Sequence, residues 1–159
     1  MKLRKILGCT LAVAMVFCLN NAGVAEQLEI GAKGPDFKAI SVDGQEVSLD
    51  SLKGAKAIVL AFTCNGCPVA VAYEDRFMAF QKKYAEKGVK FVAINVNATD
   101  DLKAMKERVE EKGLNYIYAY DESGDSARAF GAKVTPHLFI LDADGAVAYQ
   151  GAFDDKQAD

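Results

Sequence analysis

The sequence of 159 residues predicts one α/β domain with a central mixed β-sheet flanked by helices. Two observations lead to this fold class. Strand-like and helix-like segments alternate through residues 55–130, and a pair of short strands joined by an Asp-Gly turn stands at each end of that alternation. Strand–helix–strand units place parallel strands in a central sheet, and the closing hairpin adds an antiparallel edge.

The first half of the domain contains three predicted elements. Apolar positions alternate through residues 37–49 on both sides of an Asp-Gly turn, which predicts a β-hairpin. Residues 55–62 are a continuous apolar run, typical of a strand buried on both faces. Apolar side chains then recur every three or four positions over residues 69–84, ahead of Gly88, which predicts an amphipathic helix with a glycine stop.

The second half repeats both patterns. The predicted elements are strands at 89–96 and 116–121, helices at 102–113 and 123–130, and a closing hairpin of 137–142 and 146–153. The tyrosines at 116, 118 and 120 alternate with smaller residues, so we expect them to lie on one face of their strand and to pack against a helix. Only six residues follow Phe153, too few for a further helix over the sheet, and an uncovered apolar face would be an association liability, which suggests truncation.

The first 25 residues differ in kind from the rest. A basic start precedes an almost wholly apolar stretch over residues 6–19, and small residues lead up to Ala25. This pattern predicts a signal peptide over 1–25, cleaved after Ala25 and followed by a polar lead over 26–33. An uncleaved anchor is the alternative, although the apolar stretch is short for a spanning helix. The predicted location is the bacterial periplasm or cell envelope.

Removal of the signal peptide changes the charge and the cysteine count. It takes three of the 19 basic residues and none of the 22 acidic ones, so the net charge moves from −3 to −6 (16 − 22). A nucleic acid is therefore not an expected partner. Of four cysteines only Cys64 and Cys67 remain, in a chain predicted to reach an oxidising compartment.

These two cysteines stand three positions apart, between the apolar run and the amphipathic helix, in the sequence FTCNGCP. A disulfide between them would close too small a loop to be a useful structural staple. At the first turn of a helix, free backbone N–H groups and the positive end of the dipole stabilise an anion. A thiolate there should have a lowered pKa, so the pair is interpreted as a redox centre.

These motifs and their order resemble the redoxin branch of the thioredoxin superfamily, which includes thiol-disulfide oxidoreductases and the AhpC/TSA antioxidant proteins. The resemblance covers residues 34 to about 155 and rests on GPDF, IVLAFTCNGCP and VTPHLFILDADG. It implies a thioredoxin-like domain over 34–159 with an N-terminal β-hairpin extension. Within it, Cys64 would be the nucleophile, Cys67 the resolving cysteine of a redox-active Cys64–Cys67 disulfide, and Pro136 a cis-proline facing them.

The function implied by this resemblance is an exported thiol-disulfide oxidoreductase with no bound cofactor. Cys64 would attack a substrate disulfide, and Cys67 would then displace the product by closing the internal disulfide. The backbone of Thr135 would bind an extended substrate beside Cys64. The expected partners are protein or small-molecule disulfides and a redox partner that regenerates the cysteine pair.

One departure from the family concerns proton transfer. The buried acid that the family often has on the strand before the cysteines is missing, because residues 58–62 carry no charge. His137, the one histidine, is a candidate for moving the proton of Cys67, with a suitable ordinary pKa of about 6.5. The plainer interpretation, which we favour, is a histidine at a strand surface. Glu74 is expected to lie in solvent.

Two other functions stay open. A peroxiredoxin-like peroxidase would usually have Thr or Ser three positions before its reactive cysteine, but Ala61 stands there. Arginines that could bind peroxide are present at 76, 108 and 128, with surface solvation as their expected role. A less favoured alternative is a Cu(I) metallochaperone using Cys64, Cys67 and His137, since soft thiolates suit that ion.

Overall fold

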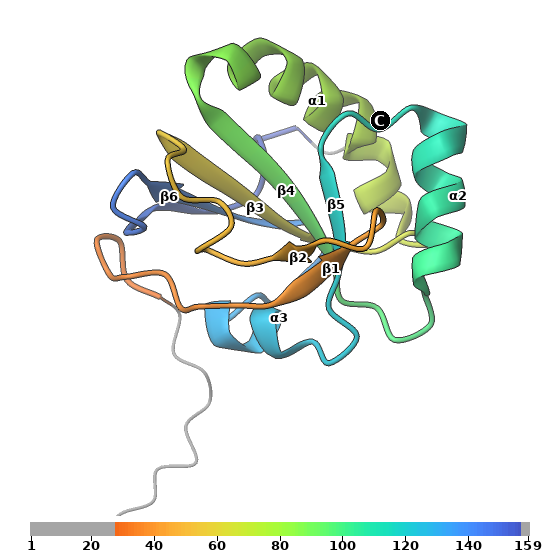
Figure 1. Cartoon of the computed structure of the whole chain (residues 1–159), viewed down its shortest axis with the longest axis horizontal. Coiled ribbons are helices and arrows are strands. Elements are labelled where there is room, and N and C mark those ends of the chain that lie inside the picture. The colour runs from red at the N-terminus through yellow and green to blue at the C-terminus, as the bar shows by residue number, and fades with distance from the viewer. Residues whose placement is uncertain (1–27, 157–159) are drawn as a thin grey trace, which may run out of the picture.

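The computed structural model describes residues 28–156 (Figure 1). The predicted signal peptide, over residues 1–25, lies outside the described residues. Within the described range, the structure contains no helix with the length and apolar character needed to cross a membrane.

A seven-stranded mixed sheet in the order β2-β1-β5-β4-β3-β6-β7 forms the centre of the domain (Figure 1). The strands are β1 (Ala39–Ser41), β2 (Glu46–Val47), β3 (Ala57–Thr63), β4 (Val89–Asn95), β5 (Ile117–Tyr120), β6 (His137–Asp142) and β7 (Val147–Gly151). The helices are α1 (Pro68–Tyr84), the short 3₁₀ helix η1 (Ala85–Lys87), α2 (Leu102–Lys112) and α3 (Asp125–Phe130). The predicted succession of elements is confirmed.

The pairing of the strands has a parallel centre and antiparallel edges. Strands β3, β4 and β5 are parallel neighbours, as strand–helix–strand units require. The β1–β2 hairpin joins this centre through an antiparallel pairing of β1 with β5. The β6–β7 hairpin joins it on the other side, antiparallel to β3. The predicted mixed sheet and both hairpins are confirmed.

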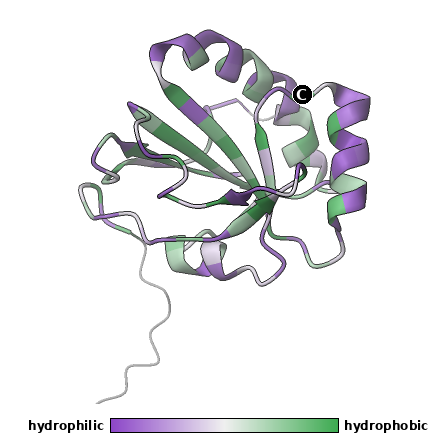
Figure 2. Ribbon diagram, viewed as in Figure 1, coloured by the Kyte–Doolittle hydropathy of each residue, from purple (hydrophilic) through white to green (hydrophobic). Residues whose placement is uncertain are grey.

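The helices cover both faces of the sheet. Alternation along β3 sends Val59 and Ala61 to the face covered by α1 and α2, where they pack with Phe77 and Met105. Phe62 and the other β3 residues that point to the opposite face lie toward α3, in one cluster with its Phe130. Figure 2 shows the central strands as largely hydrophobic, as a sheet buried on both faces requires.

Helix α1 begins directly after the second cysteine. Cys67 has extended backbone angles and is the N-cap, and Pro68 occupies the first turn, where its missing N–H is not needed. At the other end, η1 stops at Gly88, which has a positive φ of 82° and donates its N–H to the carbonyl of Ala85. The predicted glycine stop is confirmed.

The segment after β7 returns to α1. Phe153 packs against the rings of Tyr73, Phe77 and Phe80, with centroid distances of 5.8, 5.2 and 6.0 Å. Asp154 accepts hydrogen bonds from Arg76 and from the hydroxyl of Tyr73. This segment therefore packs on the same side of the sheet as α1.

The turn before α3 is built around the carboxylate of Asp121, which is only 5% exposed. One carboxylate oxygen accepts from the Gly124 N–H and the Ser123 hydroxyl, and the other accepts from the N–H and hydroxyl of Ser126. Burial alone would raise the pKa of Asp121, but these hydrogen bonds outweigh it and hold the pKa below its ordinary value.

Because the folded-state pKa of Asp121 is lowered, its contribution to stability is present above the ordinary carboxyl pKa of about 4 and is lost as the pH falls below it. We expect Asp121→Ala to lower the free energy of unfolding at pH 7 by about 2–4 kcal/mol, since several buried donors lose their acceptor. Urea denaturation between pH 3 and 7 measures this. The control is Asp125→Ala, whose exposed ion pair with Arg128 is worth about 0–1 kcal/mol. Equal effects of the two variants would contradict the prediction.

Candidate active site

The two cysteines occupy the turn between β3 and α1. Cys64 follows the last residue of β3, and Cys67 caps α1, so the buried strand and the helix fix both ends of the turn. Both side chains are partly exposed and both are free thiols. The sequence prediction of a cysteine pair between a buried strand and a helix start is confirmed in its geometry.

Thr135 contacts both sulfur atoms. The pairing of β6 with β3 brings the loop before β6 against the cysteines, about seventy positions away in the chain. The Cys64 Sγ lies 3.6 Å from the Thr135 hydroxyl, and the Cys67 Sγ donates to the Thr135 carbonyl over 3.5 Å. The peptide bond between Thr135 and Pro136 is cis. Two thiols and one threonine are thereby brought into a single site.

An open pocket of about 430 Å³ lies over this site. It is lined by Thr63, Cys64, Gly66, Cys67, Val96, Asn97 and Thr135. Two exposed valines are sequence neighbours of the lining residues: Val69 on α1 is 51% exposed and Val134 is 64% exposed. The sulfur atoms therefore lie beside an open pocket, and the surface near it includes apolar side chains.

The two thiols differ in acidity. The backbone N–H of Ala70, helped by that of Val69, favours the thiolate of Cys67 and lowers its pKa. Burial raises the pKa of Cys64, and the hydroxyl of Thr135 offsets this only in part. The expectation of a lowered pKa is therefore wrong for Cys64. The helix starts one residue after Cys67, so its free amides face that sulfur.

His137 lies in β6 and is only 7% exposed, so the favoured interpretation of a histidine at the strand surface is wrong. Its Nδ1 accepts the backbone N–H of Lys133 over 3.2 Å, and its ring lies 4.7 Å from that of Phe139. Burial and the positive charge of Lys133 lower the pKa of His137, which favours the neutral imidazole. His137 is not among the residues that line the cysteine pocket.

A hydrogen-bonded network holds Asn65, the residue after Cys64. Its N–H donates to Asp100 Oδ2 over 2.8 Å, and its Oδ1 accepts from the Tyr118 hydroxyl over 2.6 Å. The fully buried Asn95 donates to both Asp100 and Tyr118. Sequence reasoning missed this network. The available signal was the acidic pair after the second buried strand, because the carboxyl ends of parallel strands meet at one edge.

The three arginines considered for peroxide binding are each paired with a carboxylate. Arg76 pairs with Asp154, Arg128 with Asp125, and Arg108 with Glu74. The Arg108–Glu74 pair joins α2 to α1 through two hydrogen bonds of 2.9 and 2.7 Å, and the Glu74 side chain is only 12% exposed. The expectation that Glu74 lies in solvent is wrong. None of the three arginines lines the cysteine pocket.

Metal-binding side chains do not gather at the cysteines. Over residues 28–156, no group of three or more His, Cys, Asp and Glu side chains is placed to hold a metal ion. In particular, His137 is turned toward Lys133 rather than joining the two sulfur atoms in a three-ligand set. Any binding of Cu(I) would rest on the two thiols.

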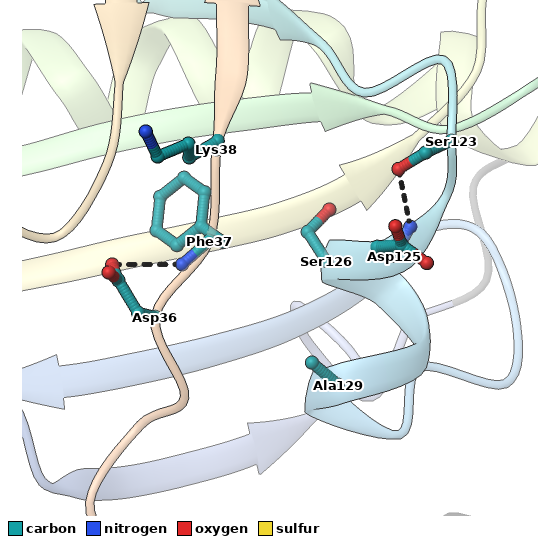
Figure 3. A pocket seen from close by; sticks show the side chains of 7 residues that line it. All are labelled: Asp36, Phe37, Lys38, Ser123, Asp125, Ser126 and Ala129. Atoms are coloured by element: carbon teal, nitrogen blue, oxygen red, sulfur yellow. Dashed lines mark hydrogen bonds between the residues drawn. The ribbon is translucent and has the colours of Figure 1, made fainter.

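Another pocket lies between α3 and the segment before β1 (Figure 3). Its polar side chains already have partners within the chain: Asp36 accepts the Phe37 N–H, and the Ser123 hydroxyl accepts the Asp125 N–H. The Ser126 hydroxyl donates to Asp121. No cysteine or histidine lines this pocket.

The family comparison agrees with this geometry. Residues 29–159 match the family model described as Redoxin. The chain belongs to the redoxin family. The predicted resemblance is thus confirmed.

This redoxin is similar to proteins with two kinds of name. It is 31% identical over 125 residues to the "Thiol-disulfide oxidoreductase ResA" of Bacillus thuringiensis, covering 77% of this chain and 69% of the relative. It is 25% identical to the "Putative peroxiredoxin bcp" of Helicobacter pylori, covering 81% and 87%. A solved structure of a "putative Thiol:disulfide interchange protein DsbE" from Chlorobium tepidum aligns with a TM-score of 0.70 and 28% identity, covering 79% and 86%.

These comparisons establish the fold and the class of activity. The thioredoxin-like α/β fold predicted from the sequence is confirmed by the solved structure. The prediction of an oxidoreductase acting in thiol–disulfide chemistry is confirmed at the level of the family and its relatives.

Proposed function

We propose that this redoxin is an exported thiol-disulfide oxidoreductase that exchanges disulfides through Cys64 and Cys67. The observation that carries the proposal is the contact of both sulfur atoms with Thr135, in an open pocket at the start of α1. This arrangement puts two thiols within reach of each other and of an entering chain. The proposal includes the predicted signal peptide over 1–25, the polar lead over 26–33 and the redoxin domain over 34–159.

In the proposed reaction, the Cys64 thiolate attacks one sulfur of a substrate disulfide. A mixed disulfide forms, and the other substrate sulfur leaves as a thiolate. Cys67 then attacks the Cys64 sulfur, the Cys64–Cys67 disulfide forms, and the second substrate sulfur leaves. The dithiol has then given two electrons to the substrate, and a separate redox partner must return them.

The surrounding residues support separate parts of this reaction. The lowered pKa of Cys67 favours the thiolate that the second step needs. The backbone at Thr135 and Pro136 is proposed to bind an extended substrate segment, with the exposed Val69 and Val134 as its apolar neighbours. A role of His137 in proton transfer stays a prediction.

Replacement of the resolving cysteine tests the order of events. In Cys67→Ser, the mixed disulfide between Cys64 and a disulfide substrate cannot be displaced internally, so we expect it to accumulate to about the protein concentration. Mass spectrometry of the protein after mixing with oxidised insulin or a disulfide peptide detects it. The matched variant is Cys64→Ser, in which little adduct is expected. Accumulation on Cys67 in that variant instead would reverse the two proposed roles.

A peroxidase of the peroxiredoxin kind is the second candidate, because relatives named putative peroxiredoxins match most of the chain. The arginines paired elsewhere and the alanine at position 61 count against it. Peroxide consumption, disulfide reduction and copper stoichiometry measured side by side separate the candidates. Rapid peroxide turnover would favour the peroxidase, and tight binding of Cu(I) without turnover would favour the metallochaperone.

A further inference from the structure

The backbone N–H that follows Cys64 is already bound to a carboxylate. Asp100, in the loop between β4 and α2, accepts it over 2.8 Å. The same oxygen, Oδ2, accepts the side-chain N–H of Asn95 over 2.8 Å. Because Asn95 is fully buried and also contacts Tyr118, the carboxylate is held in place from within the protein.

The two cysteines therefore stand in opposite surroundings. Cys67 faces free amides at the start of α1, and these stabilise its thiolate. The amide next to Cys64 is occupied by Asp100, so the Cys64 thiolate is favoured only by the Thr135 hydroxyl and the backbone N–H of Cys67, which do not offset its burial. The negative charge of Asp100 would in addition repel a second anion close by. Both effects oppose ionisation of the Cys64 thiol.

The other groups around Cys64 come from three elements. Two titratable groups interact electrostatically with the Cys64 thiol: Cys67, directly before α1, and Tyr118 on β5. Thr135, before β6, offers a hydroxyl. Tyr118 is buried and its pKa is raised, so it stays neutral. Asp100 is the carboxylate that contacts the turn between the cysteines.

We propose that Asp100 is a positioning residue that holds the Asn65 amide away from the Cys64 sulfur and so restrains the formation of the Cys64 thiolate. The inference deepens the proposed function, and its relevance to catalysis rests on that function. Its consequence is that the proposed nucleophile is less reactive in the resting dithiol than the position of the pair at a helix start suggests.

The test measures the alkylation rate of Cys64 by iodoacetamide between pH 6 and 10. All variants are made in a Cys67→Ser protein, so that the second thiol cannot influence the ionisation of Cys64. Mass spectrometry measures alkylation of the peptide that contains Cys64, separately from any other cysteine. We expect the rate at pH 7 to rise about threefold in Asp100→Asn, which loses the charge but keeps an acceptor. In Asp100→Ala, which also frees the Asn65 amide, we expect the alkylation rate at pH 7 to rise about tenfold. The pH profile should shift to lower pH in both.

The matched control is Asp101→Asn, one residue along. It removes the same charge, and asparagine can still accept the Ala104 N–H that Asp101 accepts over 2.7 Å as the cap of α2. Tyr118→Phe removes the hydroxyl contacts with Asn65 and Asn95 but keeps both hydrogen bonds to Asp100, so only a small change is expected. Equal alkylation profiles for Asp100→Asn and Asp101→Asn in folded protein would overturn the proposal, as would an equal rise in Tyr118→Phe.

This experiment is independent of the proposed activity. Alkylation needs no disulfide substrate and no turnover, so a protein without oxidoreductase activity would still report the influence of Asp100 on Cys64. Conversely, an active enzyme whose Cys64 profile ignores Asp100 would overturn the inference and leave the proposed function standing.

Discussion

Cys64→Ser is expected to lower the rate of insulin disulfide reduction by about a thousandfold or more, to the uncatalysed level. A serine hydroxyl is not ionised near neutral pH and forms no bond comparable to a mixed disulfide, so no exchange can begin at this position. The Cys64–Cys67 disulfide is also impossible in this variant, so two-electron transfer stops whichever sulfur attacks first. Turbidity of insulin in the presence of a thiol reductant measures the rate.

The matched control is the same substitution at Cys9 and Cys18, which lie in the predicted signal peptide. We expect that double variant to keep the wild-type rate. The thermal midpoint of Cys64→Ser should stay near that of the wild type, because the change replaces one partly exposed sulfur by oxygen. Retention of the wild-type rate in a folded Cys64→Ser protein would end the proposed function.

Phe77→Ala is expected to lower the free energy of unfolding by about 3–5 kcal/mol, the largest effect on stability that we predict. Phe77 is 1% exposed. Its ring centroid lies 5.0 Å from that of Phe91 in the sheet and 5.2 Å from that of Phe153 after β7. Truncation would leave a cavity where α1, the sheet and the final segment meet. Because α1 begins beside Cys67, the proposed redox site should lose its geometry at a lower temperature.

Phe80→Ala is the matched control for this prediction. Phe80 lies on the same helix and contacts Phe91 and Phe153, but it is only partly buried. The same deletion there should cost about half as much or less. Urea denaturation of the three proteins at pH 7 measures the differences. A Phe77→Ala protein as stable as Phe80→Ala would show that the cluster can close over the missing ring.

The elements of this fold could be predicted because their patterns are strong and local. Apart from Lys56, Lys90 and Asn95, the runs over 55–62 and 89–96 are apolar on both faces, which suits strands covered on both sides. The place of the first hairpin could not be predicted in the same way. Its pairing of Ile40 with Tyr120 joins residues far apart in the chain, and no local pattern states which strand a hairpin will meet.

Within the site, the residues could be predicted but the acidity could not. The spacing of Cys64 and Cys67 and the Thr-Pro pair before a strand were visible in the sequence. Which sulfur meets the free amides depends on where the helix starts, and the apolar pattern does not fix that boundary to the residue. The contact of Asn65 with Asp100 depends on the path of a loop 35 positions away, since Thr99 and Asp101 were equally available polar neighbours.

The contact of one threonine with both sulfur atoms also makes the site a property of the complete tertiary structure. The sequence CNGC supplies the thiols, but Thr135 reaches them only when β6 has paired with β3, and Asp100 only when β4 has paired as well. A short peptide carrying CNGC would lack both neighbours. The difference in reactivity that we predict between the two cysteines would therefore serve as a chemical reporter of the native state during refolding or limited proteolysis.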